Sequence, residues 1–106
     1  MSTAWIALIC AGIAEIGWPV GLKISQMPDK TVPGIVIAVI SLIFSGSLLW
    51  FAQKEIPIGT SYAVWTGIGA AGTFLVGVFY FGDATNILRY VAVGLIIGGV
   101  ILLKAA

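Results

Sequence analysis

Four apolar runs, separated by short polar breaks, constrain this chain more than any other feature of its sequence. They cover residues 3–22, 32–52, 58–80 and 87–103 approximately. A helix rises 1.5 Å per residue, so about 20 residues cross the ~30 Å hydrocarbon core of a bilayer. Backbone groups in hydrocarbon must be satisfied within the segment, and no run has the alternating polar pattern of a barrel strand. The sequence therefore predicts an all-α membrane protein, with four transmembrane helices in a single domain that spans residues 1–106.

The overall composition indicates the same class of protein. Hydrophobic residues make up 60% of the 106 residues and charged residues only 8%, whereas soluble domains carry roughly a quarter. Membrane lipid is thus the expected solvent. The net charge is +1 and there is no cluster of Lys or Arg, so the chain has no basic surface for binding nucleic acid. The chain has no histidine and only one cysteine, Cys10, so we expect no metal site and a packing role for Cys10. We also expect no cofactor and no enzyme activity.

The polar breaks predict where helices end. Thr31 is a candidate N-cap ahead of Pro33, and the short break at residues 53–57 makes the second and third spans antiparallel neighbours. Candidate caps for the last helix are Asp83, Thr85 and Asn86.

The positive charges at the helix ends are nearly balanced between the two faces. One face holds Lys23, Lys30 and Arg89, and the other holds Lys54 and Lys104. An excess of Lys and Arg on one face sets the orientation of a membrane protein, so this small difference does not specify a single orientation. We therefore expect the chain to insert in both orientations and opposite copies to pair as a dual-topology antiparallel homodimer.

Glu15 is the one acidic residue inside an apolar run. Asp29, Glu55 and Asp83 fall in the breaks, where a solvated surface charge is the simple interpretation. An ionisable group near mid-membrane is costly and usually marks an ion pathway or proton relay. A proton and a small cation would compete for its oxygens, and this competition is the coupling that exchange requires. The alternative is a structural carboxyl, held neutral by a hydrogen bond.

Small and aromatic residues surround Glu15 on its helical face. Gly12 and Trp18 lie three residues before and after it, and Pro19 lies four residues after. The small residues either leave space for a ligand or allow close helix packing. Pro19 has no N–H to donate to the Glu15 carbonyl, which predicts a kink or an additional acceptor at this point.

The later spans supply further candidates. Tyr62, Trp65 and Thr66 share a stripe with Gly69 in the third span, although an aromatic belt near the lipid headgroups would also explain the two aromatic residues. In the same span Gly67 and Gly69 are candidate hinge positions. The last span has a GxxxG motif and no polar side chain in its apolar run, so we expect dimer packing through Gly94, Gly98 and Gly99.

Three segments resemble the small multidrug resistance family of bacterial transporters, over essentially the whole chain. They are the first-helix segment AGIAEIGW at 11–18, the third-helix segment PIGTSYAVWTGIG at 57–69, and the glycine-rich last helix. Trp18 three residues after Glu15, with the PIGT sequence at 57–60, is similar to the guanidinium-exporter branch. Pro19 and the GDAT sequence at 82–85 depart from the family pattern.

The resemblance implies an antiparallel homodimer in the bacterial inner membrane that exports guanidinium, and small substituted guanidiniums, in exchange for protons by alternating access. Glu15 would bind cation and proton. Ser45 and Trp18 would orient the carboxylate, while Tyr62 and Trp65 would line the cavity and its gate. Proton-coupled export of quaternary ammonium or other hydrophobic cations is the alternative within the family. A dual-topology ion channel or a purely structural membrane subunit are alternatives from other classes.

Overall fold

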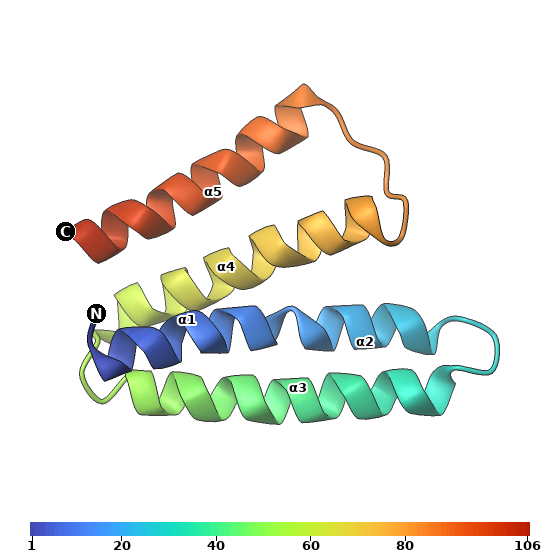
Figure 1. Cartoon of the computed structure of the whole chain (residues 1–106), viewed down its shortest axis with the longest axis horizontal. Helices are drawn as coiled ribbons and strands as arrows, with labels where there is room; N and C mark the ends of the chain where they lie inside the picture. Colours follow the sequence, from blue (N-terminus) through green and yellow to red (C-terminus); the bar gives the residue numbers. More distant parts are fainter.

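A computed structural model describes residues 1–106 as helices joined by short loops, with no strand (Figure 1). Two of the helices, α1 and α2, make up one span of 23 residues, so the chain has four helical segments long and apolar enough to cross a membrane. The predicted all-α membrane fold is thereby confirmed. In chain order the helices are α1 (Thr3–Glu15), α2 (Gly17–Ser25), α3 (Thr31–Ala52), α4 (Ile58–Phe79) and α5 (Ile87–Ala105).

The first span is interrupted at Ile16, as Pro19 led us to expect. Proline cannot donate to the Glu15 carbonyl, so the helical ladder loses a bond there. The Ile16 N–H donates to the Ile13 carbonyl at 3.2 Å, and the Val20 N–H donates to the Ile16 carbonyl at 3.3 Å. The chain therefore makes a local turn and continues in nearly the same direction as α2 (Figure 1).

Two of the predicted helix ends can be compared with the structure. The Asn86 side chain caps α5 by accepting the Arg89 N–H at 2.9 Å, which confirms that candidate. The prediction for Thr31 was wrong, because Thr31 is already helical and Lys30 precedes it without a side-chain cap. The Gly34 N–H reaches the Lys30 carbonyl at 3.0 Å. Pro33 thus falls within the first turn, where a missing N–H costs nothing.

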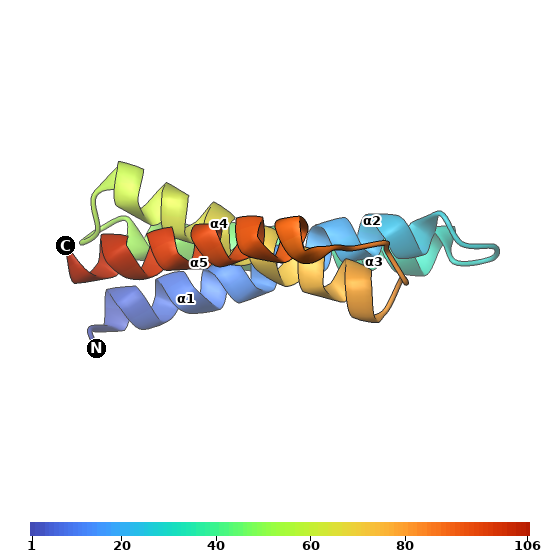
Figure 2. The ribbon, with the colours of Figure 1, turned by 90° about the horizontal axis from the view of Figure 1, so that it is seen from above.

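The helices are arranged with α1 and α2 at the centre. The third helix, α3, packs along both of them, α4 packs mainly on α1, and α5 has its backbone contacts with α4 alone. Figure 1 shows α5 inclined away from the other helices. The two termini lie at one end of the bundle, and the α2–α3 and α4–α5 loops lie toward the other (Figures 1 and 2).

The interior is small and relies on close backbone approach. Only 17 of 106 residues are buried, so most apolar side chains lie on the surface of the single chain. Cys10 is exposed on α1, so it has no packing role within the single chain. Between α2 and α3, a Cβ added to Gly21 would lie 2.6 Å from the Ala38 nitrogen and 2.7 Å from the Gly34 oxygen. The buried hydrophobic cluster consists of Ala4, Ala7, Leu8, Ala52, Ile56 and Val64.

Candidate functional site

The Glu15 side chain lines a cavity halfway along the first span. It is the last residue of α1, at the helix interruption, and it is half-buried. The cavity has a volume of about 300 Å³, and Glu15 is the only charged residue in its lining. The lining residues are Glu15, Trp18, Pro19, Thr66, Gly69, Ala70 and Thr73.

Ser45 connects three helices behind the carboxylate. Its side chain is fully buried on α3. The hydroxyl donates to the Ala11 carbonyl at 2.7 Å, accepts the Trp65 indole N–H at 2.8 Å, and lies 3.5 Å from Glu15 Oε1. A serine hydroxyl has one proton, so it cannot donate fully to both acceptors at once. Ser45 can therefore accept from a protonated Glu15 while bonded to Ala11, or turn its proton toward an ionised Glu15.

Gly69 provides the space that Glu15 occupies. A Cβ at this position would lie 2.7 Å from Glu15 Cγ and 3.1 Å from its Cβ. A larger residue would therefore push the acid away from α4. Gly12 has a packing role instead, because a Cβ there would lie 2.7 Å from the Ile68 Cβ, and Gly12 does not line the cavity.

Trp18 lines the cavity without bonding to the carboxylate. Its indole nitrogen is buried and has no hydrogen-bond partner within the chain. The Thr66 hydroxyl, also in the lining, donates to the Tyr62 carbonyl at 2.8 Å, so its oxygen retains lone pairs for a ligand. The site thus combines one carboxylate with hydroxyl acceptors and an aromatic face.

Tyr62 lies outside this cavity. Its side chain is 56% exposed, and its ring packs on the Trp65 ring at a centroid distance of 5.6 Å. Trp65 itself acts through Ser45 and is not in the lining. Among the candidate hinge glycines, Gly67 faces α5, where a Cβ would lie 2.6 Å from the Val100 side chain. The sequence thus indicated residues that lie near Glu15, but it did not predict which atoms each of them contacts.

Two lining residues, Ala70 and Thr73, were not among the sequence candidates. A signal for them exists, because residues 66, 69, 70 and 73 follow the spacing of a single helical face. Extending the stripe of Thr66 and Gly69 by one turn would have found both.

The chain is similar to known membrane transport proteins over nearly its full length. A sequence model described as "Small Multidrug Resistance protein" matches residues 3–96. The chain belongs to the small multidrug resistance family. Relatives named "Guanidinium exporter" include one from Yersinia pseudotuberculosis, 44% identical over 103 residues, which cover 97% of this chain and 98% of the relative. Another, from Escherichia coli (strain K12), is 44% identical over 101 residues, or 95% of each chain.

Membership in the small multidrug resistance family agrees with the four membrane-spanning helices. The family, the four spans and the bacterial relatives named as exporters together identify this chain as a multi-pass protein of the bacterial inner membrane. The matched residues include the whole first span, which carries Glu15 at the cavity.

Proposed function

We propose that this protein exports guanidinium in exchange for protons, with cation and proton competing for Glu15. The observation that supports the proposal most strongly is the position of Glu15 as the only charged group in a mid-span cavity. The names of the relatives favour guanidinium as the cation.

Guanidinium fits the chemistry of this cavity. Like the arginine side chain, it stays charged at physiological pH and presents planar N–H donors that match a carboxylate in a two-pronged contact. Glu15 supplies that carboxylate, and the Thr66 oxygen supplies a further acceptor. The Trp18 ring adds a cation–π face worth about 0.5–2 kcal/mol.

Ser45 links the protonation state of Glu15 to its surroundings. When Glu15 is protonated, its hydroxyl donates to Ser45, and Ser45 keeps its 2.7 Å bond to Ala11. When Glu15 is ionised, the Ser45 proton turns to the carboxylate and holds it in place for the cation. The Trp65 N–H is bonded to Ser45 in both states and fixes the position of its oxygen. Because the cation and the proton bind the same carboxylate, binding of the cation requires release of the proton.

Transport also requires that the cavity open to each face in turn. We assign this alternating access to an antiparallel homodimer in which two copies insert in opposite orientations. The nearly balanced Lys and Arg residues at the two ends of the bundle support dual insertion. The open glycine stripe of α5, at Gly94, Gly98 and Gly99, supports pairing through that helix, because a Cβ at any of these positions would meet nothing within 4 Å.

The test is transport by the protein reconstituted in liposomes, measured for guanidinium and for a bulky aromatic cation under imposed pH gradients. We expect guanidinium transport to need an opposing proton gradient, because the cation and the proton bind the same carboxylate. Glu15→Gln should reduce transport by roughly 100-fold or more. Glu55→Gln, a change of the same kind in a loop, is the matched control.

Three results would contradict the proposal. Normal transport by Glu15→Gln would remove its mechanism. Guanidinium flux without any proton movement would indicate a channel. Preference for the bulky cation over guanidinium would place the protein among exporters of hydrophobic cations.

A further inference from the structure

A second polar cavity adjoins the one that holds Glu15. It has a volume of about 240 Å³, and it shares Pro19 and Thr73 with the Glu15 cavity as common walls. Only three of its eight lining residues are hydrophobic, whereas the three remaining cavities of the chain have six of eight, eight of nine and six of six. The two polar cavities thus adjoin each other, and together they are called the passage. The lining residues of the second are Pro19, Val20, Lys23, Thr73, Val76, Gly77, Phe81 and Asp83.

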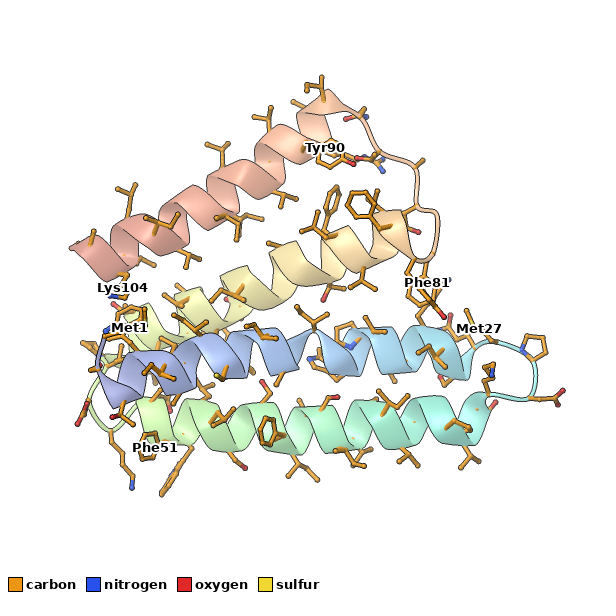
Figure 3. All side chains as sticks on the ribbon, viewed as in Figure 1. Met1, Met27, Phe51, Phe81, Tyr90 and Lys104 are labelled. Carbon is orange, nitrogen blue, oxygen red and sulfur yellow. The ribbon has the colours of Figure 1, made fainter.

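Asp83 supplies a carboxylate at the outer end of this passage. The sequence indicated only a solvated surface charge at this position, but the chain folds Asp83 back onto α4. Gly82, with φ of +72°, makes the turn, and the Asp83 N–H donates to the Gly77 carbonyl at 2.9 Å. The carboxylate lies directly against Gly77, where any side chain would collide with it. Figure 3 places Phe81, which precedes this turn, between the end of α4 and α2.

Both acidic side chains pack over a glycine of α4. The Cβ and Cγ of Glu15 lie over Gly69, and the carboxylate of Asp83 lies over Gly77. These glycines are eight residues apart, which corresponds to about 12 Å along the helix axis at 1.5 Å per residue. Thr73 lies halfway between them and lines both cavities. A small cation moving from one carboxylate to the other would therefore pass one hydroxyl group on the way.

Lys23 gives the outer site a competing positive charge. It comes from α2 and lines the same cavity as Asp83. Its ammonium opposes the entry of a second cation and is attracted to the same carboxylate, so it limits how tightly Asp83 can hold a guest. A site on a transport path must release its ion, and a weak site meets that need.

We propose that Asp83, together with Thr73, forms an outer binding site for the transported cation, between the α4–α5 loop and Glu15. This inference rests on the proposed function, since it names a second site on the path of the same guanidinium. It assigns Asp83 to capture and release of the cation, while exchange with protons stays with Glu15.

The test compares Asp83→Asn with Asp29→Asn in guanidinium transport by liposomes. Both variants lose one carboxylate from a loop at the same end of the bundle, but Asp29 does not line the passage. We expect the apparent KM to rise roughly three- to tenfold for Asp83→Asn, with kcat nearly unchanged, and Asp29→Asn to resemble the parent protein. Lys23→Gln should lower the KM, whereas Lys30→Gln, a control in the α2–α3 loop outside this cavity, should leave it unchanged.

A binding measurement separates this inference from the proposed function. In the Glu15→Gln background, guanidinium chloride at millimolar concentration should shift the amide NMR signals of Gly77 and Asp83 more than sodium chloride does. The additional Asp83→Asn change should abolish the difference. If the parent protein does not transport guanidinium, the proposed function fails. If it does transport guanidinium, but Asp83→Asn matches Asp29→Asn in KM and the amide signals do not move, the outer site is wrong.

Discussion

The α2–α3 interface and the outer face of α5 are both rich in glycine, yet the two surfaces differ completely in what those glycines contact. At Gly21 and Gly34 an added Cβ would meet backbone atoms of the opposite helix within 2.7 Å. At Gly94 and Gly98 it would meet nothing within 4 Å. A small-residue motif thus indicates that close approach is allowed, while only the fold shows whether the approaching partner belongs to the same chain.

The largest effect should come from filling the α2–α3 interface. Gly21→Leu forces the leucine side chain against the α3 backbone, which cannot yield as a flexible side chain could. We expect the free energy of unfolding to fall by about 3 kcal/mol. Tryptophan fluorescence during unfolding in detergent micelles measures this change.

Gly46→Leu provides the control for that experiment. Gly46 lies on α3 with nothing within 4 Å of an added Cβ, so its replacement should change the free energy of unfolding by less than about 0.5 kcal/mol. Equal losses for the two variants would mean that α2 and α3 are not closely packed at Gly21.

A smaller effect of a different kind is expected on α5. Gly98→Leu should leave the fold of the single chain intact, because an added Cβ meets no atom of the chain within 4 Å. It should weaken self-association by about 2 kcal/mol, since the close helix contact is lost. Energy transfer between labelled copies, diluted in lipid, measures the association.

Val93→Leu is the control on α5. Val93 lies about 100° or more around the helix from each of Gly94, Gly98 and Gly99, away from the glycine stripe. If Val93→Leu weakened association as much as Gly98→Leu, the glycine stripe would not be the pairing surface.

The smallest effect in this series should follow from Trp65→Phe. The change removes the indole N–H that Ser45 accepts at 2.8 Å but keeps an aromatic ring. We expect the apparent affinity for guanidinium to fall roughly fivefold, because a neutral hydrogen bond contributes about 1 kcal/mol. Trp50→Phe, at an exposed position near the end of α3, should have no such effect in the same liposome assay. An unchanged affinity for Trp65→Phe would mean that Ser45 is held in place without the indole.

The fold was the more predictable part of this protein. Four apolar runs of membrane length define four spans, because hydrocarbon permits little besides helices. The runs do not define the helix ends. The apolar runs stop near residues 22 and 103, whereas the helices continue through Lys23 to Ser25 and through Lys104 to Ala105. Long basic side chains reach the interface from a helix that extends beyond the hydrocarbon.

The candidate site was predictable only in part. Glu15 is evident from the cost of an acid in an apolar run, and Pro19 predicts the interruption beside it. The bonds that Ser45 makes to Ala11 and Trp65 join three helices, and no local pattern encodes which helices become neighbours. The place of Asp83 in the second cavity could not be predicted for a related reason. Its position depends on a loop that turns back onto α4, and the sequence shows only a polar break.

The interruption at Ile16 has a mechanical consequence. It divides the first span into rods of 13 and 9 residues, with α1 packed between α3 and α4 and α2 packed mainly on α3 alone. An unbroken rod would transmit any tilt from one membrane surface to the other. An interruption at mid-depth lets α1 and α2 take their directions from different neighbours. It lies next to Glu15, so the carboxylate is placed where the two halves of the span meet.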